Sequence, residues 1–149
     1  MSQTAAADAS VFSGACLCGA IRYAARGAPA RVNHCHCVQC QRQSGAAMVT
    51  WATWPRAALR MLQGEPADFE SSPGVKRSFC RRCGSTLFWR RAPARDRADP
   101  QPEEIDIAAG TLDDADQLAP SEHIFVKSRR PWMPLCDGLP AYTESRPKP

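Results

Sequence analysis

Eight cysteines, most of them closely spaced, constrain the fold of this 149-residue chain more than any other feature. Cys136 stands alone, and the other seven form three groups: Cys16-x-Cys18, Cys35-x-Cys37-x-x-Cys40 and Cys80-x-x-Cys83. A secreted chain with an even cysteine count is expected to form disulfides, whereas a reducing compartment keeps thiols free for metals or catalysis. Because the N-terminus lacks the basic start and apolar stretch of a signal peptide, we expect a cytoplasmic protein whose cysteines bind metal.

The composition is that of a globular domain. Hydrophobic residues make up 44% of the chain and charged residues 23%, which permits a buried core. The length is close to the commonest size of one domain, so we expect a single domain over 1–149 with an ordered core at about 12–144. No apolar run approaches the length needed to cross a membrane, and we expect no membrane partner.

Short apolar runs separated by Gly, Pro, Asp and Ser predict an all-β fold with little helix. Residues 38–44 contain no Gly or Pro and are followed by Gly45, which predicts one short helical turn. Residues 91–104 are rich in Pro, Ala and charges, and we expect a loop inserted in the domain. Strands are expected at 20–24, 30–34, 46–51, 59–62, 67–70, 75–79, 86–90, 105–108 and 124–127.

The third cysteine group has the pattern of a zinc knuckle. In Cys80-x-x-Cys83-Gly84 the spacing lets both sulfurs face one ion, and the glycine permits the left-handed backbone that closes the turn. One knuckle supplies two of the four ligands of a structural zinc. The other two come either from Cys16 and Cys18 or from the middle group.

Pairing the first and third groups leaves Cys35, Cys37 and Cys40 as a compact set of three. Three protein ligands leave one position for water or substrate, which is the usual arrangement of catalytic zinc. A histidine as fourth ligand, His34 or His36, would instead close the site and make it structural. The sequence therefore predicts two zinc ions and leaves open whether the second site is catalytic.

The charge of the chain does not favour a nucleic-acid partner. The formal net charge is +4, but seven metal-bound thiolates and two Zn²⁺ would together remove three positive charges. Several of the basic residues lie beside the cysteine groups, where they balance the thiolates, and no aromatic-basic stripe for base stacking is apparent. We therefore expect nucleic acid to be an unlikely partner.

Several other residues have ordinary structural interpretations. Cys136 is expected to be a packed or surface thiol, and His123 a residue at the end of a strand. The pair Arg129-Arg130 is expected to form a solvated basic turn. Because aromatic side chains in a small β domain usually lie in the core, we expect at least half of four tryptophans to be buried: Trp51, Trp54, Trp89 and Trp132.

Six segments together resemble one protein family. In chain order they read GACLCGAIRY, CHCVQCQRQSG, FCRRCGSTLFW, GTLDD, HIFVKSRRPW and DGLPAY. The family is that of the glutathione-dependent formaldehyde-activating enzymes, which includes centromere protein V. The resemblance extends from about Gly14 to Tyr142, while the 91–104 segment and Cys136 depart from the family pattern.

The resemblance implies a β-tent fold, in which twisted antiparallel sheets are joined by a structural zinc. It also implies the condensation of glutathione with formaldehyde to S-(hydroxymethyl)glutathione, which is a carbon–sulfur lyase reaction when written in reverse. By the family pattern the catalytic zinc belongs to Cys35, Cys37 and Cys40. The structural zinc belongs to Cys16, Cys18, Cys80 and Cys83.

A small thiol and an aldehyde are therefore the expected partners. Zinc would hold the thiol as the reactive thiolate near neutral pH, with His36 or water supplying the proton for the new hydroxyl group. The alternative is a non-enzymatic zinc-binding module for protein or nucleic acid, since one fold can host several functions. Four basic residues near the motifs are candidates to hold the glutathione carboxylates: Arg42, Lys76, Arg77 and Lys127.

Overall fold

The computed structural model describes residues 10–93 and 102–147, and most of the regular secondary structure in them is β-strand. The strands are β1 (Val11–Ala15), β2 (Arg22–Arg26), β3 (Arg31–Cys35), β4 (Val49–Pro55), β5 (Leu59–Gln63), β6 (Ala67–Ser72), β7 (Val75–Phe79), β8 (Thr86–Arg91), β9 (Glu104–Ala108) and β10 (Glu122–Ile124). One α-helix and four short 3₁₀ helices accompany them: α1 (Val38–Ser44), η1 (Arg56–Ala58), η2 (Ala109–Thr111), η3 (Ala115–Gln117) and η4 (Val126–Ser128). The predicted all-β class with little helix is confirmed.

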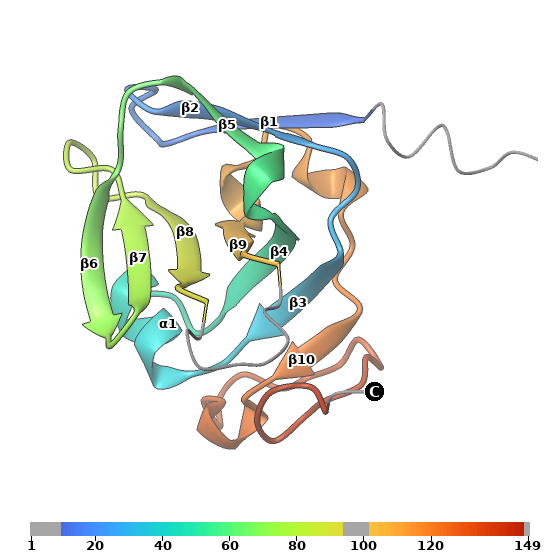
Figure 1. The fold of residues 1–149 in the computed structure, drawn as a ribbon. Coiled ribbons are helices and arrows are strands. Elements are labelled where there is room, and N and C mark those ends of the chain that lie inside the picture. The colour runs from blue at the N-terminus through green and yellow to red at the C-terminus, as the bar shows by residue number, and fades with distance from the viewer. Residues whose placement is uncertain (1–9, 94–101, 148–149) are drawn as a thin grey trace, which may run out of the picture.

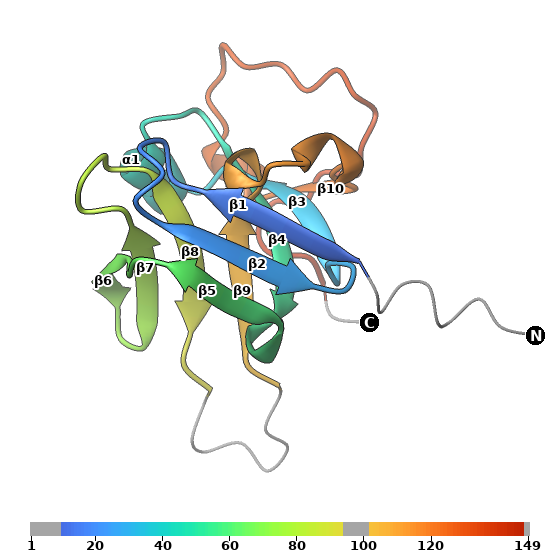
Figure 2. The same cartoon turned by 90° about the horizontal axis from the view of Figure 1, so that it is seen from above.

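The strands form two sheets of unequal size. The smaller sheet has the order β1-β2-β5, and the larger has the order β10-β3-β4-β9-β8-β7-β6. Neighbouring strands are antiparallel except for β10, which pairs in parallel with β3. The smaller sheet lies across one end of the larger one (Figure 1), and its strands cross those of the larger sheet when the molecule is viewed from above (Figure 2).

The main core lies between the two sheets. Tyr23 of β2 packs edge-on against Phe88 of β8, with ring centroids 5.0 Å apart. Trp54 of β4 is fully buried in the same cluster, and its indole N–H donates to the carbonyl of Gly27 at 2.8 Å. Because these aromatic rings come from both sheets, they fix the sheets against each other through burial of large apolar surfaces.

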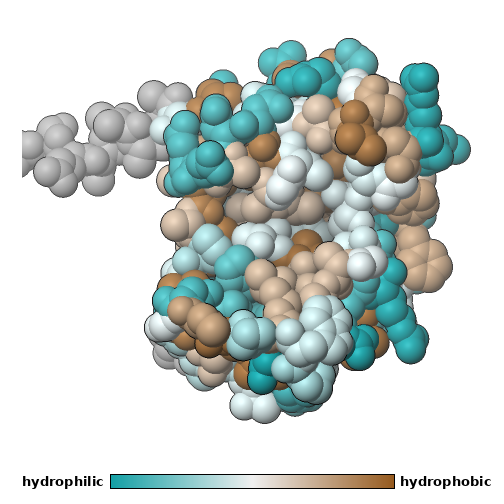
Figure 3. Space-filling view, turned by 180° about the vertical axis from the view of Figure 1, so that it is seen from behind, coloured by the Kyte–Doolittle hydropathy of each residue, from teal (hydrophilic) through white to brown (hydrophobic). Residues whose placement is uncertain are grey.

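The tryptophan prediction is confirmed. Trp51 and Trp54 are buried, with 3% and 0% of their surface exposed, whereas Trp132 is 73% exposed. On the face shown in Figure 3, hydrophobic and hydrophilic residues are interspersed, and no broad hydrophobic area covers that face. Among the described residues no helix combines the length and the apolar character that crossing a membrane requires.

The structure departs most clearly from the sequence-based expectation in three places, and elsewhere several strand ends move by a few residues, as in β2 and β4. The expected strand at 124–127 is wrong, because Phe125 adopts a left-handed conformation with φ 57°, which ends β10 and starts a 3₁₀ helix. Strand β1 was not expected, since VFSGA has no alternating apolar pattern. The expected loop at 91–104 is shortened at both ends, where Arg91 ends β8 and Glu104 begins β9. Its middle, 94–101, lies outside the described residues.

Gly14 of β1 supports a close contact between the smaller sheet and the loop after β9. A Cβ atom at Gly14 would lie 2.4 Å from the Tyr23 hydroxyl and 2.5 Å from the Thr111 carbonyl oxygen. Tyr23 is fully buried, and its hydroxyl is 2.6 Å from Thr111 Oγ1. The added methyl group therefore forces apart groups that are already in van der Waals contact.

We expect Gly14→Ala to lower the free energy of unfolding by about 2 kcal/mol or more, as overpacking of a dense core does. Gly110→Ala is the matched control, because a Cβ atom at Gly110 meets nothing within 4 Å. Chemical denaturation of both variants and the wild type measures the effect. Equal unfolding midpoints for the two alanine variants would show that Gly14 has more room than this packing indicates.

Candidate functional site

The first cysteine cluster joins the two sheets. Cys16 and Cys18 lie in the turn between β1 and β2, and Cys80 and Cys83 lie in the turn between β7 and β8. Their four Sγ atoms all lie within 4.8 Å of one another. The Sγ atoms of Cys16 and Cys18 are 3.6 Å apart, and those of Cys18 and Cys80 are 3.9 Å apart. Two sulfurs bound to one tetrahedral zinc are expected to lie ~3.8 Å apart. This donor set therefore fits a zinc ion.

Two glycine turns direct these sulfurs inward. Gly19 and Gly84 have φ angles of 74° and 79°, and their amides donate to the carbonyls of Cys16 and Cys80 at 3.0 and 2.8 Å. The left-handed glycine closes each turn so that the two cysteine side chains of a turn point to one side. This is the local geometry that the knuckle pattern predicts.

Ser85 connects the two turns. Its hydroxyl lies 3.2 Å from Cys83 Sγ and also accepts a hydrogen bond from the Leu17 amide at 2.9 Å. The contact with Ser85 lowers the pKa of the Cys83 thiol to about 5. In the other turn a backbone donor also contacts a cysteine sulfur: the Ile21 amide donates to Cys16 Sγ at 3.3 Å. Such donors favour the thiolate form that a metal requires.

The second cluster consists of three cysteines around the start of α1. Cys35 ends β3, Cys37 caps the N-terminus of α1, and Cys40 lies in the first turn of that helix. The Cys40 amide donates to Cys37 Sγ at 3.3 Å, and the three Sγ atoms lie within 4.8 Å of one another. Hydrogen bonds from the Cys35 and Cys40 thiols lower the pKa of Cys37 to about 2, and the same contacts raise the pKa of Cys35. The lowered pKa favours a thiolate at Cys37, and three sulfurs this close together suit a metal cation.

Arg77 balances this negative charge. The side chain is only 4% exposed, and its Nη1 atom donates to Cys40 Sγ at 3.6 Å and to Gln43 Oε1 at 3.0 Å. Nη2 donates to Gln39 Oε1 at 3.1 Å, and Nε donates to the Ser71 hydroxyl at 3.0 Å. The guanidinium expected at the glutathione carboxylates is thus directed at the thiol cluster and at α1.

Neither neighbouring histidine belongs to the three-thiol cluster. Nδ1 of His34 lies 2.8 Å from Thr50 Oγ1, and Nε2 of His36 lies 2.8 Å from Nδ1 of His123. Among the described residues, the cluster within 4.8 Å contains the three cysteines alone. Burial lowers the pKa of His36 to about 4, so its imidazole is neutral near pH 7 and a poor proton donor.

His123 is more than a residue at a strand end. It lies inside β10, is 1% exposed, and its Nε2 atom is 2.8 Å from Asp137 Oδ2. Sequence reasoning missed this contact because β10 has only three residues and Asp137 belongs to an irregular segment.

The remaining charged candidates lie in different surroundings. Lys76, on the opposite face of β7 from Arg77, has its Nζ atom 3.9 Å from Asp68 Oδ2, and Lys127 pairs with Glu144. Arg42 is exposed on α1 and lines two cavities beside it. Of the four candidates for glutathione, the structure therefore brings Arg42 and Arg77 to the helix that carries Cys40, and it places the two lysines in ion pairs.

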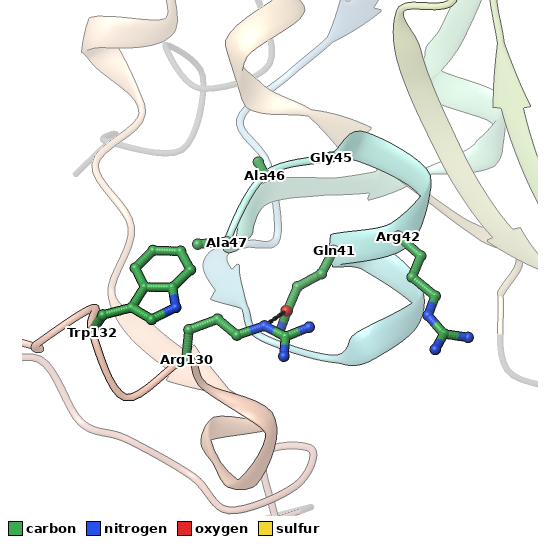
Figure 4. A pocket seen from close by; sticks show the side chains of 7 residues that line it. All are labelled: Gln41, Arg42, Gly45, Ala46, Ala47, Arg130 and Trp132. Atoms are coloured by element: carbon green, nitrogen blue, oxygen red, sulfur yellow. Dashed lines mark hydrogen bonds between the residues drawn. The ribbon is translucent and has the colours of Figure 1, made fainter.

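The smaller cavity, of about 190 Å³, has a cationic rim formed by Arg42 and Arg130, with the 73% exposed Trp132 beside it (Figure 4). Arg130 Nε donates to Gln41 Oε1 at 2.5 Å, and Gln41 Nε2 donates to the His36 carbonyl at 2.6 Å. Of the expected solvated pair, Arg130 is exposed and Arg129 is half-buried. Arg130 is also linked through Gln41 to the backbone of His36, between Cys35 and Cys37. The larger cavity, of about 330 Å³, is lined by Gln39, Arg42, Gln43, Phe69, Ser71 and Arg77.

Comparison with protein families gives a match to the model described as "Glutathione-dependent formaldehyde-activating enzyme" over residues 11–128. A crystal structure of a protein from Rhodobacter sphaeroides is similar, with 26% sequence identity and a TM-score of 0.52. The similarity covers 68% of this chain and 88% of that protein. Comparison with curated proteins gives no match.

Proposed function

Because the chain belongs to the glutathione-dependent formaldehyde-activating enzyme family, we propose that it is a zinc-dependent carbon–sulfur lyase that forms S-(hydroxymethyl)glutathione or a related thiol adduct. One observation carries the proposal: the second cluster offers three sulfur ligands where the first offers four. A tetrahedral ion bound by three protein ligands keeps one position for a substrate group.

The chemistry is a balanced addition. The glutathione sulfur forms a bond to the formaldehyde carbon, the carbonyl double bond becomes a single bond, and the thiol proton ends on the new hydroxyl oxygen. When bound by Cys35, Cys37 and Cys40, Zn²⁺ supplies the charge that keeps a substrate thiol deprotonated near neutral pH.

The residues around the cluster have separate roles in this proposal. Arg77 offsets the charge of the three thiolates, so that a fourth, incoming sulfur meets less repulsion. Arg42 and Arg130 lie at the cavity beside α1, where they are suited to bind the carboxylates of glutathione. His36 fixes the cluster backbone, because its amide donates to the Ile124 carbonyl at 3.0 Å.

We expect Cys37→Ala to lower the glutathione-dependent loss of formaldehyde, above the uncatalysed rate, by at least about 100-fold, because a metal ligand is lost. Cys136→Ala is the matched control, since Cys136 is exposed and belongs to neither thiol cluster. Both variants are loaded with zinc, and their metal content is measured beside the rate. Equal formaldehyde loss in the wild type and Cys37→Ala would leave the non-enzymatic zinc module as the better description.

A further inference from the structure

We propose that His34, His123 and Asp137 form a third metal site, which binds a divalent first-row transition ion through two imidazoles and one carboxylate. Their candidate ligand atoms all lie within 4.8 Å of one another, and none of the three residues belongs to either thiol cluster. The site goes beyond the proposed lyase function, which needs only the cysteines.

Strand pairing places the two imidazoles side by side. His34 and His123 are register partners in the parallel pair β3–β10, and their ring centroids are 4.8 Å apart at an interplanar angle of 32°. Asp137 comes from the C-terminal segment, which crosses beside β10: the His123 amide donates to the Pro140 carbonyl, and Ala141 forms a β-bridge with His123. Three separate segments of the chain therefore converge on one point.

A hydrogen bond at Nδ1 fixes the position of each imidazole. Nδ1 of His34 is held by Thr50 Oγ1, and Nδ1 of His123 is held by Nε2 of His36, each at 2.8 Å. Nε2 of His123 is hydrogen-bonded to Asp137 Oδ2 at 2.8 Å, so a bound metal ion would take the place of the proton that lies between these two atoms, and the imidazole would keep its proton on Nδ1. A partner at the second ring nitrogen is the usual companion of a metal-binding histidine, because it fixes the tautomer and the ring orientation.

The carboxylate completes the donor set at the protein surface. Asp137 Oδ2 lies 2.8 Å from Nε2 of His123, and the Asp137 side chain is 43% exposed while that of His123 is 2% exposed. An ion reaches the buried imidazole from this exposed side, and water fills its remaining positions. Ligands about 2.1 Å from a tetrahedral ion lie ~3.4 Å apart, so small side-chain rotations bring the three atoms to binding distance.

The donor types distinguish this site from the two thiol clusters. Imidazole and carboxylate bind zinc, cobalt and nickel without a metal–sulfur bond. Bound Co²⁺ therefore shows ligand-field absorption at the proposed site, and thiolate-to-cobalt charge-transfer absorption only at the cysteine clusters. The two kinds of site can be followed separately in one titration.

We expect a Co²⁺ titration of the full chain to give further ligand-field absorption after the charge-transfer absorption has saturated. Asp137→Asn keeps a side-chain oxygen near His123 but removes the anionic ligand, and we expect it to weaken this last binding step by at least about 100-fold. The matched control is Asp116→Asn, which changes an exposed acid outside the cluster and should bind as the wild type does.

The charge-transfer absorption also reports on the folding of each variant, because it requires intact thiol clusters. Three results would overturn the proposed site: no binding after saturation, equal late binding in the wild type and Asp137→Asn, or a smaller charge-transfer absorption in Asp137→Asn. The last result would place Asp137 in support of the cysteines instead. Formaldehyde turnover does not enter this test, so failure of the lyase proposal remains a separate result.

Discussion

Cys80→Ala is expected to leave little folded protein. Cys80 is 1% exposed and belongs to the main core, and its sulfur meets those of Cys16 and Cys18 from the other sheet. A structural zinc contributes roughly 10 kcal/mol or more to folding in small zinc domains, which is comparable to the whole stability of a typical domain. Loss of one ligand therefore removes a link between the sheets that hydrophobic contacts alone are not expected to replace.

Circular dichroism and thermal unfolding of zinc-loaded protein measure this effect. Cys136→Ala serves as the control, because it removes an exposed thiol outside both thiol clusters and should unfold like the wild type. A Cys80→Ala protein that folds normally and holds half the wild-type zinc would contradict the pairing of Cys16 and Cys18 with Cys80 and Cys83.

Arg77→Gln is expected to weaken zinc binding at the three-thiol cluster by about 10- to 100-fold, as loss of an outer-shell partner of a metal ligand does. The substitution removes a buried positive charge whose nearest atom lies 3.6 Å from Cys40 Sγ. Zinc at the four-thiol cluster should bind unchanged. Competition with a chelator of known zinc affinity measures the two sites as separate steps.

Two companion variants separate charge from packing at this position. Arg77→Lys retains a positive charge and should recover much of the affinity, although it loses the planar donor geometry. Lys76→Gln changes the adjacent, exposed residue and should leave both steps unchanged. If Arg77→Gln binds zinc at the second cluster as tightly as Lys76→Gln does, the guanidinium has no part in stabilising the thiolates.

The short-range features of the chain were accessible from residue spacing. The turn after Cys80 and the helix that ends at Gly45 depend on contacts within about four residues, and both are present. Alternation and chain breaks likewise indicated the strands. Strand β1 was missed because its own residues do not alternate, and it forms by pairing with the next strand, β2. At Phe125 a contact from farther along the chain contributes, since the Phe125 amide donates to the Glu144 carbonyl.

Residue spacing alone predicted which cysteines can hold metal, because thiols two or three positions apart can face one ion from a single turn. It left open which half-sites combine, since Cys18 and Cys80 meet across 62 positions through the packing of two sheets. The direction of Arg77 and the convergence of His34, His123 and Asp137 likewise depend on strand register and on the path of the C-terminal segment. Such contacts arise only when the chain packs, because no local pattern encodes which distant strand becomes a neighbour.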